Sequence, residues 1–412
     1  MSTNSGNPRP LEGIRVLDLS GGVVGPVGGG VIADLGAQII RIEQPARVAA
    51  QRRQQRTYRS QGITVPVLTG MNVHHHDKMH LLLDLRQPEG LEVFKLLVLV
   101  SDVIFENFSP HVMPSYNLEC PALQEINPGI IHVAMPAYGS TGPYKNFVSL
   151  GPGVNALSGI SDLTGYVDGP PLKPGNYYGD YTNGLLASYC IFSGLFARAQ
   201  TGRGQHIEAS MREVETHAFG EALLDYTLNG RVQTRQGNRH FSMAPHNVYP
   251  CRGEDYWVAI AVENDKQWQA LIRVMGSPTW AKDQRFATAQ DRHQFQDEID
   301  KHLSDWTRDQ EHREVMTMLQ TAGVPAGAAL HPDEMLEDPQ LLHRGFYRDI
   351  PGTALKTSSV GWKFSDTPMP IRRSSPEFGE QNDWVLRELL ALPNSHIETL
   401  REKGVTSYDL PV

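Results

Sequence analysis

Short apolar runs alternate with helix-like segments along the first half of the chain. The first run, 14–19, has little polar interruption, which is typical of a strand buried on both faces of a parallel sheet. Helical periodicity follows several of these runs, for example after Pro88, a residue favoured at a helix start. The predicted strands are 14–19, 38–42, 81–85, 101–105, 130–135 and 205–211. This order predicts an α/β fold with a mostly parallel sheet covered by helices.

The pattern changes in the second half of the chain. A helix at 183–199 carries apolar residues around most of its circumference, which predicts that it is well buried. The stretch 229–238 is rich in Gly, Arg and Asn and marks the best internal boundary. A strand at 256–262 then begins a different unit. Near the end, 384–403 is expected to form two short helices broken at Pro393.

Length, composition and charge narrow the class of protein. A chain of 412 residues exceeds the size of one hydrophobic core, so two domains are expected. The 37 Lys and Arg residues against 46 Asp and Glu give a net charge of −9, and we expect no nucleic-acid partner. An anionic ligand would need a few well-placed cations and backbone N–H groups.

The cysteines and the apolar runs bear on the compartment. Three widely spaced cysteines argue against a disulfide framework. No apolar run approaches the length of about 20 residues that a membrane span needs, and the first ten residues are polar. We therefore expect a cytoplasmic protein without membrane contact.

Two segments invite a ligand-binding interpretation. The glycines at 28–33 fit a dinucleotide-binding pattern poorly, because the turn glycines precede them and Glu43 follows too early, so close packing is favoured. A nicotinamide-dependent dehydrogenase is accordingly a remote alternative. The run 74–76 holds three adjacent histidines before Asp77, which cannot all face one ion, so we favour a solvated turn and expect no metal.

Asp180 stands in a segment rich in Gly and Tyr, directly before the long predicted helix. Taken alone, such an Asp most often caps a helix by accepting N–H bonds from the first turn. A carboxylate with a low pKa at a helix start, with glycines leaving room for a bulky electrophile, could instead attack an activated carbonyl. Nearby N–H groups would then stabilise the oxyanion. Capping and catalysis are compatible, and both stay open here.

The ordered set of motifs resembles the family III CoA-transferases (CaiB/BaiF family), which include formyl-CoA, carnitine-CoA and benzylsuccinate-CoA transferases. The resembling segments cover nearly the whole chain: 11–19, 33–45, 83–85, 106–108, 138–144, 179–181, 198–205, 322–326, 338–340, 344–345 and 386–405. The resemblance implies a Rossmann-like large domain made from both chain ends, 1–228 and 336–412, around a smaller α+β domain, 229–335. It also implies an interlocked homodimer or a heteromer of related subunits.

The resemblance further implies a CoA-transferase activity and the residues that carry it. Asp180 would attack an acyl-CoA, such as succinyl-CoA, to form a mixed anhydride and then an aspartyl-CoA thioester, from which an acceptor carboxylic acid takes the CoA. Arg41 and Asn107 would contact the CoA nucleotide, Lys78 its phosphates, and Tyr138 would lie near the thioester. A coenzyme A thioester is thus the expected substrate, and no tightly bound cofactor is expected.

The chain departs from the family pattern at positions where cations are usual. Ser109 follows Asn107-Phe108 in place of an Arg, and Ser115 occupies a second basic position. Loss of these guanidinium groups should weaken CoA binding in a net-negative protein. The candidates to replace them are Arg52, Arg53 and Arg56. The alternative is a catalytically silent or CoA-poor subunit of a heteromeric CoA-transferase.

Two further expectations concern the reaction and its acid. An acyl-CoA racemase or isomerase of the same fold is less favoured, because the position of its catalytic His is Leu150, which cannot move a proton. Arg239 and His246 are candidate contacts for the acid substrate. Their loop precedes the strand 256–262, and a simple connecting turn is the favoured interpretation of it.

Overall fold

The computed structural model divides into two compact units. Unit 1 comprises Met1–Ile160, Lys173–Gly230 and Gly345–Val412, and unit 2 comprises Ser161–Leu172 and Arg231–Arg344. Within these ranges the structure describes residues 9–48, 74–175, 177–352, 356–358 and 360–407. Unit 1 therefore combines segments from both ends of the chain. The predicted domains, 1–228 with 336–412 around 229–335, have other bounds and stay a prediction.

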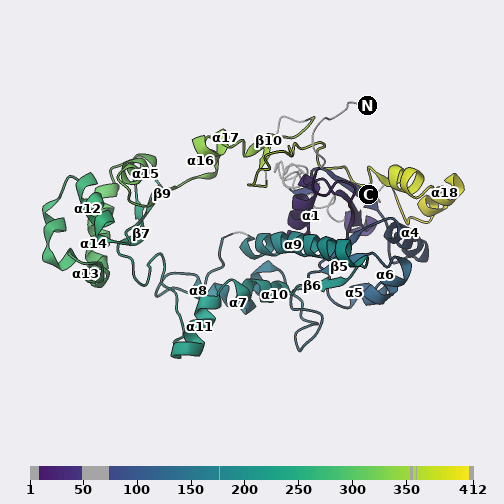
Figure 1. The fold of residues 1–412 in the computed structure, drawn as a ribbon, viewed down its shortest axis with the longest axis horizontal. Helices are drawn as coiled ribbons and strands as arrows, with labels where there is room; N and C mark the ends of the chain where they lie inside the picture. Colours follow the sequence, from purple (N-terminus) through teal and green to yellow (C-terminus); the bar gives the residue numbers. More distant parts are fainter. Residues whose placement is uncertain (1–8, 49–73, 176, 353–355, 359, 408–412) are drawn as a thin grey trace. The chain divides into compact units, whose positions relative to one another are not determined.

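A six-stranded sheet, of which Figure 1 labels β5 and β6, forms the centre of unit 1. Its strands lie in the order β3-β2-β1-β4-β5-β6. Its strand pairs are all parallel, which confirms the predicted α/β fold. The strands are β1 (Arg15–Asp18), β2 (Gln38–Glu43), β3 (Lys78–Leu82), β4 (Val103–Glu106), β5 (Ile131–Ala134) and β6 (His206–Glu208). The strand order reverses between β1 and β4. Sheets of this type bind ligands outside the carboxyl ends of the strands, at the point of reversal.

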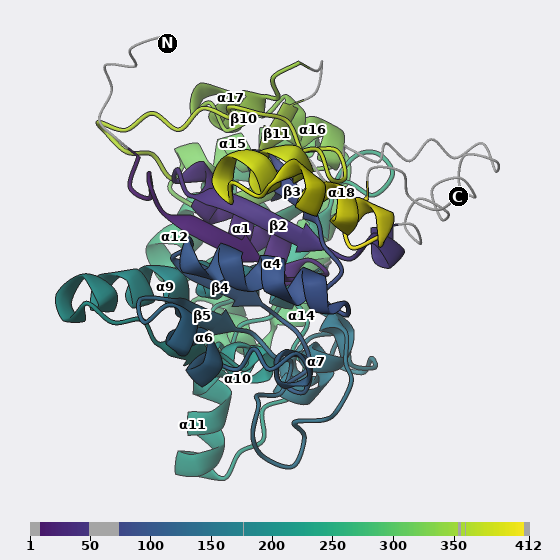
Figure 2. The same ribbon diagram turned by 90° about the vertical axis from the view of Figure 1, so that its right-hand side faces the viewer.

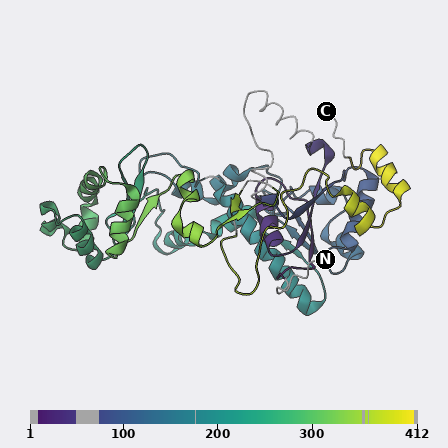
Figure 3. The same cartoon turned by 90° about the horizontal axis from the view of Figure 1, so that it is seen from above.

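Two layers of helices cover the sheet. In register, Val16 of β1 pairs with Ile39 and Val103, and these side chains face α1 (Val24–Asp34) and α9 (Tyr178–Thr201). Leu17, one residue on, faces the other layer, as alternation along a strand requires. That layer consists of α4 (Pro88–Leu99), the π-helix η3 (Trp384–Leu389) and α18 (Asn394–Glu402), and Figures 2 and 3 show α4 and α18 on one side of the sheet.

Shorter elements complete unit 1. They are α5 (Val112–Ser115), α6 (Cys120–Ile126), α7 (Gly151–Ser158), α10 (Met211–His217), α11 (Gly220–Asn229) and the antiparallel pair β10 (Tyr347–Asp349) and β11 (Lys356–Ser358). Helix α8 (Ile160–Leu163) begins at the last residue of one unit-1 segment. The two short helices predicted at the end of the chain are confirmed as η3 and α18, with Pro393 at the N-cap of α18.

The glycines of α1 allow this helix to approach α9 closely. A β-carbon at Gly28 would lie 2.8 Å from the carbonyl oxygen of Gly184, and one at Gly184 would lie 2.7 Å from the β-carbon of Val27. Larger residues at either position would push the helices apart. The predicted packing role of this glycine run is therefore confirmed.

Helix α9 is less buried than the sequence predicts. Ala187 and Ile191 pack against the sheet, whereas Leu185, Tyr189 and Phe196 are 49%, 67% and 69% exposed. The prediction of a well-buried helix is wrong because periodicity counts apolar residues around a helix without showing which side the sheet covers. An apolar stripe on α9, formed by Leu185, Tyr189 and Phe196, is left uncovered within the described chain.

The turn of histidines is also different from the prediction. His76 is buried, with Nε2 2.8 Å from Asp34 Oδ1. Oδ1 of Asp77 accepts backbone N–H bonds from Arg372 and Arg373 at 2.9 and 2.7 Å. The predicted solvated turn is wrong because the returning C-terminal segment covers it, a contact that local sequence does not reveal. Within the described ranges, no group of three His, Cys, Asp or Glu residues could hold a metal ion.

Unit 2 has an antiparallel three-stranded sheet in the order β7-β8-β9, packed with helices. Its core includes Trp268, Leu271, Ile299 and Leu319. The strand predicted at 256–262 is confirmed as β8. The elements are β7 (His246–Pro250), β8 (Trp257–Ala261), α12 (Asp265–Val274), η1 (Thr279–Lys282), η2 (Gln284–Phe286), α13 (Ala289–Gln294), α14 (Gln296–Thr307), α15 (His312–Thr321), β9 (Ala326–Ala329), α16 (Pro332–Leu336) and α17 (Pro339–His343). Across the described parts of both units, no helix has the length and apolar character needed to cross a membrane.

Candidate active site

A cavity of about 380 Å³ in unit 1 includes the loops that follow β1 and β4. Gly21 and Asn107 lie in these loops and join them through two hydrogen bonds. The Gly21 N–H donates to Asn107 Oδ1 at 2.8 Å, and Asn107 Nδ2 donates to the Gly21 carbonyl oxygen at 3.0 Å. The cavity therefore lies where the strand order reverses, the place at which this type of sheet binds ligands.

Asp180 lines this cavity from the first turn of α9. The N-cap of α9 is Tyr177, whose φ of 59° is left-handed, and it makes no side-chain cap hydrogen bond. The predicted capping role of Asp180 is therefore wrong, because the helix begins earlier than its apolar pattern. Asp180 is half-buried, and no described residue donates a hydrogen bond to its carboxylate. Burial raises the pKa of Asp180, contrary to the low pKa expected at a helix start.

The start of α7 forms the wall next to this carboxylate. A β-carbon at Gly151 would lie only 2.7 Å from Asp180 Oδ2. Glycine at this position therefore leaves space for the Asp180 carboxylate. Tyr138 lines the same cavity, and its ring packs edge-to-face with the rings of Tyr144 and Phe147 at 6.5 and 6.3 Å. The fold thus brings together three of the predicted site residues: Asp180, Asn107 and Tyr138.

The other two predicted CoA contacts, Arg41 and Lys78, lie in a buried ion-pair network. Lys78 Nζ is 3.3 Å from Asp18 Oδ2 and donates to the Pro26 carbonyl oxygen at 3.2 Å. Arg41 pairs with Glu43, and its Nη1 is 3.9 Å from Asp18 Oδ2. Burial lowers the pKa of Lys78 to about 8. Neither Arg41 nor Lys78 is among the described residues that line the cavity around Asp180.

Two cations that the sequence analysis missed do line this cavity. Arg47 and Lys145 are exposed, and neither forms an ion pair with a described residue. A β-carbon at Gly21 would lie 2.8 Å from Arg47 Nη2, which places this guanidinium beside the loop after β1. The signal for Arg47 was its position four residues after the end of β2, at the carboxyl edge of the sheet. The replacements considered from the sequence, Arg52, Arg53 and Arg56, lie outside the described residues.

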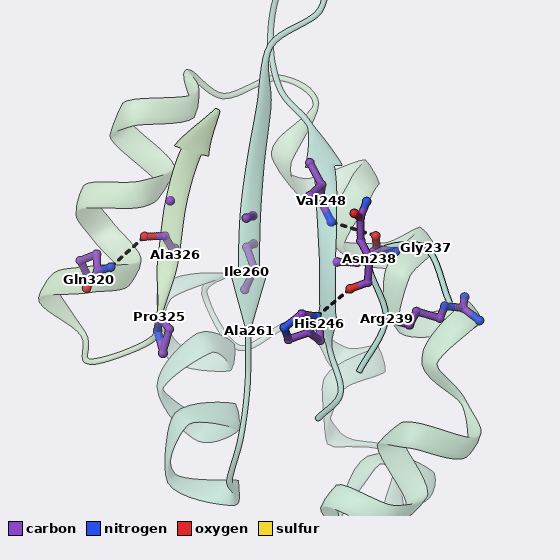
Figure 4. Close-up of a pocket in the computed structure, with 13 residues that line it drawn as sticks. Gly237, Asn238, Arg239, His246, Val248, Ile260, Ala261, Gln320, Pro325 and Ala326 are labelled. Atoms are coloured by element: carbon purple, nitrogen blue, oxygen red, sulfur yellow. Dashed lines mark hydrogen bonds between the residues drawn. The ribbon is translucent and has the colours of Figure 1, made fainter. Parts of the chain in front are cut away.

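Arg239 and His246 line a different cavity, of about 560 Å³, in unit 2. The Arg239 guanidinium pairs with Asp297 and Asp300 of α14, so its charge is balanced locally. His246 Nδ1 donates to the Asn238 carbonyl oxygen at 2.6 Å. Figure 4 shows Arg239 extending away from the His246 ring. Nδ1 of His246 and the guanidinium of Arg239 are thus both already bound to groups of unit 2.

Comparisons with known proteins give the same family throughout. The chain is 32% identical over 402 residues to succinyl-CoA–D-citramalate CoA-transferase from Chloroflexus aurantiacus, covering 97% of this chain and 98% of the relative. It is 32% identical over 390 residues to succinate–glutarate CoA-transferase from Agrobacterium fabrum, covering 92% and 96%. A solved CaiB/BaiF family protein from Brucella suis is 29% identical, with a TM-score of 0.82 over 93% of this chain and 100% of that chain. The family model described as CoA-transferase family III matches residues 11–382. This chain is therefore an enzyme that belongs to CoA-transferase family III.

Proposed function

We propose that this enzyme moves CoA between an acyl-CoA, such as succinyl-CoA, and a carboxylic acid, with Asp180 as the nucleophile. One observation carries the proposal: a half-buried carboxylate, without a hydrogen-bond donor among the described residues, lines the cavity at the reversal of strand order. A carboxylate that is partly dehydrated and not engaged in an ion pair is free to attack an acyl carbon. The relatives named above support succinyl-CoA as donor.

The proposed reaction involves the Asp180 carboxyl group in every step, first as a nucleophile and then as the group that is attacked. The Asp180 carboxylate attacks the thioester carbonyl, the C–S bond breaks, and CoA leaves as a thiolate from a mixed anhydride. The thiolate then attacks the Asp180 carbonyl carbon, which releases the donor acid and leaves an aspartyl-CoA thioester. The acceptor carboxylate repeats these two exchanges in reverse order. Splitting the transfer in this way avoids the direct displacement of one anion by another.

The substrate contacts follow from the cavity. Asn107 joins the two loops at the carboxyl ends of β1 and β4, and Tyr138 lines the same cavity as Asp180. Arg47 and Lys145 are the cations that would meet the phosphates of CoA, since both lie free at the cavity. The roles of Arg41 and Lys78 in CoA binding stay predictions, and their burial with Asp18 favours a structural role.

The test is detection of the covalent intermediate. We expect intact-mass measurement after incubation with succinyl-CoA to show a gain of CoA less one water. Asp180→Ala should lose this adduct and reduce kcat at least about a thousandfold, because nucleophile loss removes the covalent route. Asp168→Ala, at an exposed position in unit 2, is the matched control and should keep both. An adduct that persists in Asp180→Ala would contradict the proposal.

A second candidate is a subunit whose CoA site lies mainly in a related chain. Two relatives, the alpha and beta subunits of succinyl-CoA–L-malate CoA-transferase from Chloroflexus aurantiacus, are each 30% identical to this chain. The missing cations at Ser109 and Ser115 favour this candidate, whereas Arg47 and Lys145 favour a site in this chain. Calorimetric titration of the purified chain with CoA decides between them, since micromolar binding would exclude a CoA-poor subunit.

The uncovered apolar stripe on α9 supports assembly with another copy or a related subunit. Large exposed apolar side chains at helical spacing mark surfaces that another chain covers. The interlocked dimer implied by the resemblance is proposed on this ground. Light scattering of the purified chain should give the mass of a dimer, and a monomer that gains mass only with a related subunit would point to a heteromer.

A further inference from the structure

Glu215 of α10 is a buried carboxyl group that the proposed reaction does not use. The residue is 2% exposed. Its Oε2 accepts a hydrogen bond from Asn155 Nδ2 at 2.8 Å, and its Oε1 accepts one from Asn183 Nδ2 at 3.3 Å. Among the described residues it forms no ion pair with Lys, Arg or His. The Ser158 side chain also hydrogen-bonds to this carboxyl group, so all of its partners are neutral. A buried carboxyl group without a cationic partner is costly to ionise, and an apolar or amide side chain would fill the space at less cost.

The carboxyl group of Glu215 lies directly against the turn that carries Asp180. A β-carbon at Gly179 would overlap Glu215 Oε1 and would lie 2.6 Å from Asn155 Nδ2. Asn183 Nδ2 also donates to the Gly179 carbonyl oxygen at 2.8 Å. Asn155 of α7 and Asn183 of α9 therefore connect their helices to α10 through Glu215. The contact with Gly179 lies one residue before the proposed nucleophile.

The charges of this pair are coupled. Two carboxyl groups in one partly dehydrated site, without a cation between them, do not both ionise easily. Burial raises the pKa of Glu215, and the charge on Asp180 raises it further. The side-chain hydrogen bonds from Asn155, Ser158 and Asn183 oppose this rise. Asp180 is the charged residue with the largest influence on Glu215, and it faces the cavity, where its charge is better hydrated.

We propose that Glu215 is a positioning residue for Asp180 that holds a proton while Asp180 is a free carboxylate and releases it when Asp180 is acylated. This inference rests on the proposed function. In the acylation, the Asp180 carboxylate and an acyl-CoA are converted into the aspartyl-CoA thioester and a free acid anion. Because the thioester carries no charge, Glu215 can then ionise, and its proton leaves to solvent. No bond to Glu215 forms or breaks except the one to this proton.

A measurable pH dependence follows from linkage. If the charge on Asp180 favours protonation of Glu215, then protonation of Glu215 must disfavour acylation of Asp180 by the same factor. The ratio of acylated to free enzyme should therefore rise with pH, by at most about tenfold per pH unit for a single proton. The rise should occur above the ordinary range of a glutamate, because the pKa of Glu215 is raised.

The experiment measures this ratio in the whole enzyme. Wild type is equilibrated with fixed succinyl-CoA and succinate between about pH 5 and 8, quenched in acid, and the ratio of CoA adduct to free chain is read by intact mass. Glu215→Gln, which has no titratable group at this position, is treated in the same way. The ionisation of succinate affects the ratio equally in both proteins, so it cancels when they are compared. The adduct-to-free ratio of wild type is then divided by that of Glu215→Gln at each pH. We expect this quotient to rise at least threefold across one pH unit, within the limit of about tenfold that a single proton sets.

A second variant separates charge from folding. Glu215→Gln combined with Asn155→Asp moves the carboxyl group from α10 to α7 and keeps a hydrogen bond between the same two positions. This double variant should regain a pH dependence that Glu215→Gln has lost. A quotient that stays flat with pH would overturn the inference while leaving the adduct on Asp180 intact. Absence of any adduct in wild type, or its persistence in Asp180→Ala, would instead overturn the proposed function and this inference with it.

Discussion

Two pairs of cations in unit 1 have opposite surroundings. Arg41 of β2 and Lys78 of β3 are buried, and they pair with Asp18 and Glu43. Arg47 and Lys145 are exposed at the cavity with Asp180 and have no ion-pair partner among the described residues. Each pair is one Arg and one Lys, so residue type does not distinguish them.

The difference between the pairs lies in their counter-charges. A cation that is already matched by a buried carboxylate cannot leave that partner without exposing an uncompensated charge. A cation without such a partner is available to a phosphate and attracts it over several ångströms. In a chain with a net charge of −9, the overall field does not attract a polyanion such as CoA, so its binding would have to depend on local cations without a counter-charge.

The largest expected effect comes from breaking the buried pair. Lys78→Met leaves Asp18 with its nearest cation 3.9 Å away and should reduce the free energy of unfolding by about 3–5 kcal/mol, the usual cost of removing one partner of a buried ion pair. Urea unfolding followed by circular dichroism measures this loss. Lys145→Met makes the same chemical change at an exposed position and should alter stability by less than about 0.5 kcal/mol.

The contrast between the buried and the exposed pair of cations would be wrong if Lys78 bound CoA. A Lys78→Met protein with wild-type stability and a strongly raised KM for acyl-CoA would assign this residue to CoA binding. The pKa of Lys78, lowered to about 8, also predicts the direction in which stability changes with pH. Between that value and its ordinary 10.5, the unfolded chain binds more protons, so wild-type stability should rise with pH relative to Lys78→Met.

The fold of unit 1 could largely be predicted from the sequence because its signals are local. A run such as 14–19 and the helix start at Pro88 follow from apolar spacing and backbone preference. Strand ends moved, as at β3, which begins at Lys78 and not at 81. That strand begins with buried polar residues whose partners, such as Asp18, lie far away in the sequence, so periodicity does not detect it.

The candidate site could be predicted only in part. Asp180, Asn107 and Tyr138 line one cavity. They were predicted as site residues from the family resemblance, because their spacing in the sequence does not by itself place them together. The burial of Arg41 by Asp18 and Glu43 depends on which side chains the folded sheet brings together. The same holds for Arg47, whose free guanidinium becomes evident only when its surroundings are known.

A smaller effect is expected from narrowing the cavity without removing any charge. Gly151→Ala would place a methyl group 2.7 Å from Asp180 Oδ2, so the carboxylate must shift. We expect kcat to fall about 10- to 100-fold, since displacement of a reacting group by about 1 Å has this cost, with little change in urea unfolding. Gly220→Ala, where no atom lies within 4 Å of the added carbon, is the control. Equal kcat values in the two variants would show that Asp180 tolerates the shift.

The smallest expected effect comes from removing either of the two cations that lie free at the cavity. Arg47→Met and Lys145→Met should each raise the KM for acyl-CoA about tenfold, the loss of one charge-assisted phosphate contact, with kcat within about twofold of wild type. Steady-state kinetics at two ionic strengths measures both. In wild type the KM should rise with salt, and each variant should show a weaker rise, since a removed charge can no longer be screened. A variant with unchanged KM and salt dependence would remove that cation from the CoA site, and the phosphates would then have to be bound by residues other than this pair.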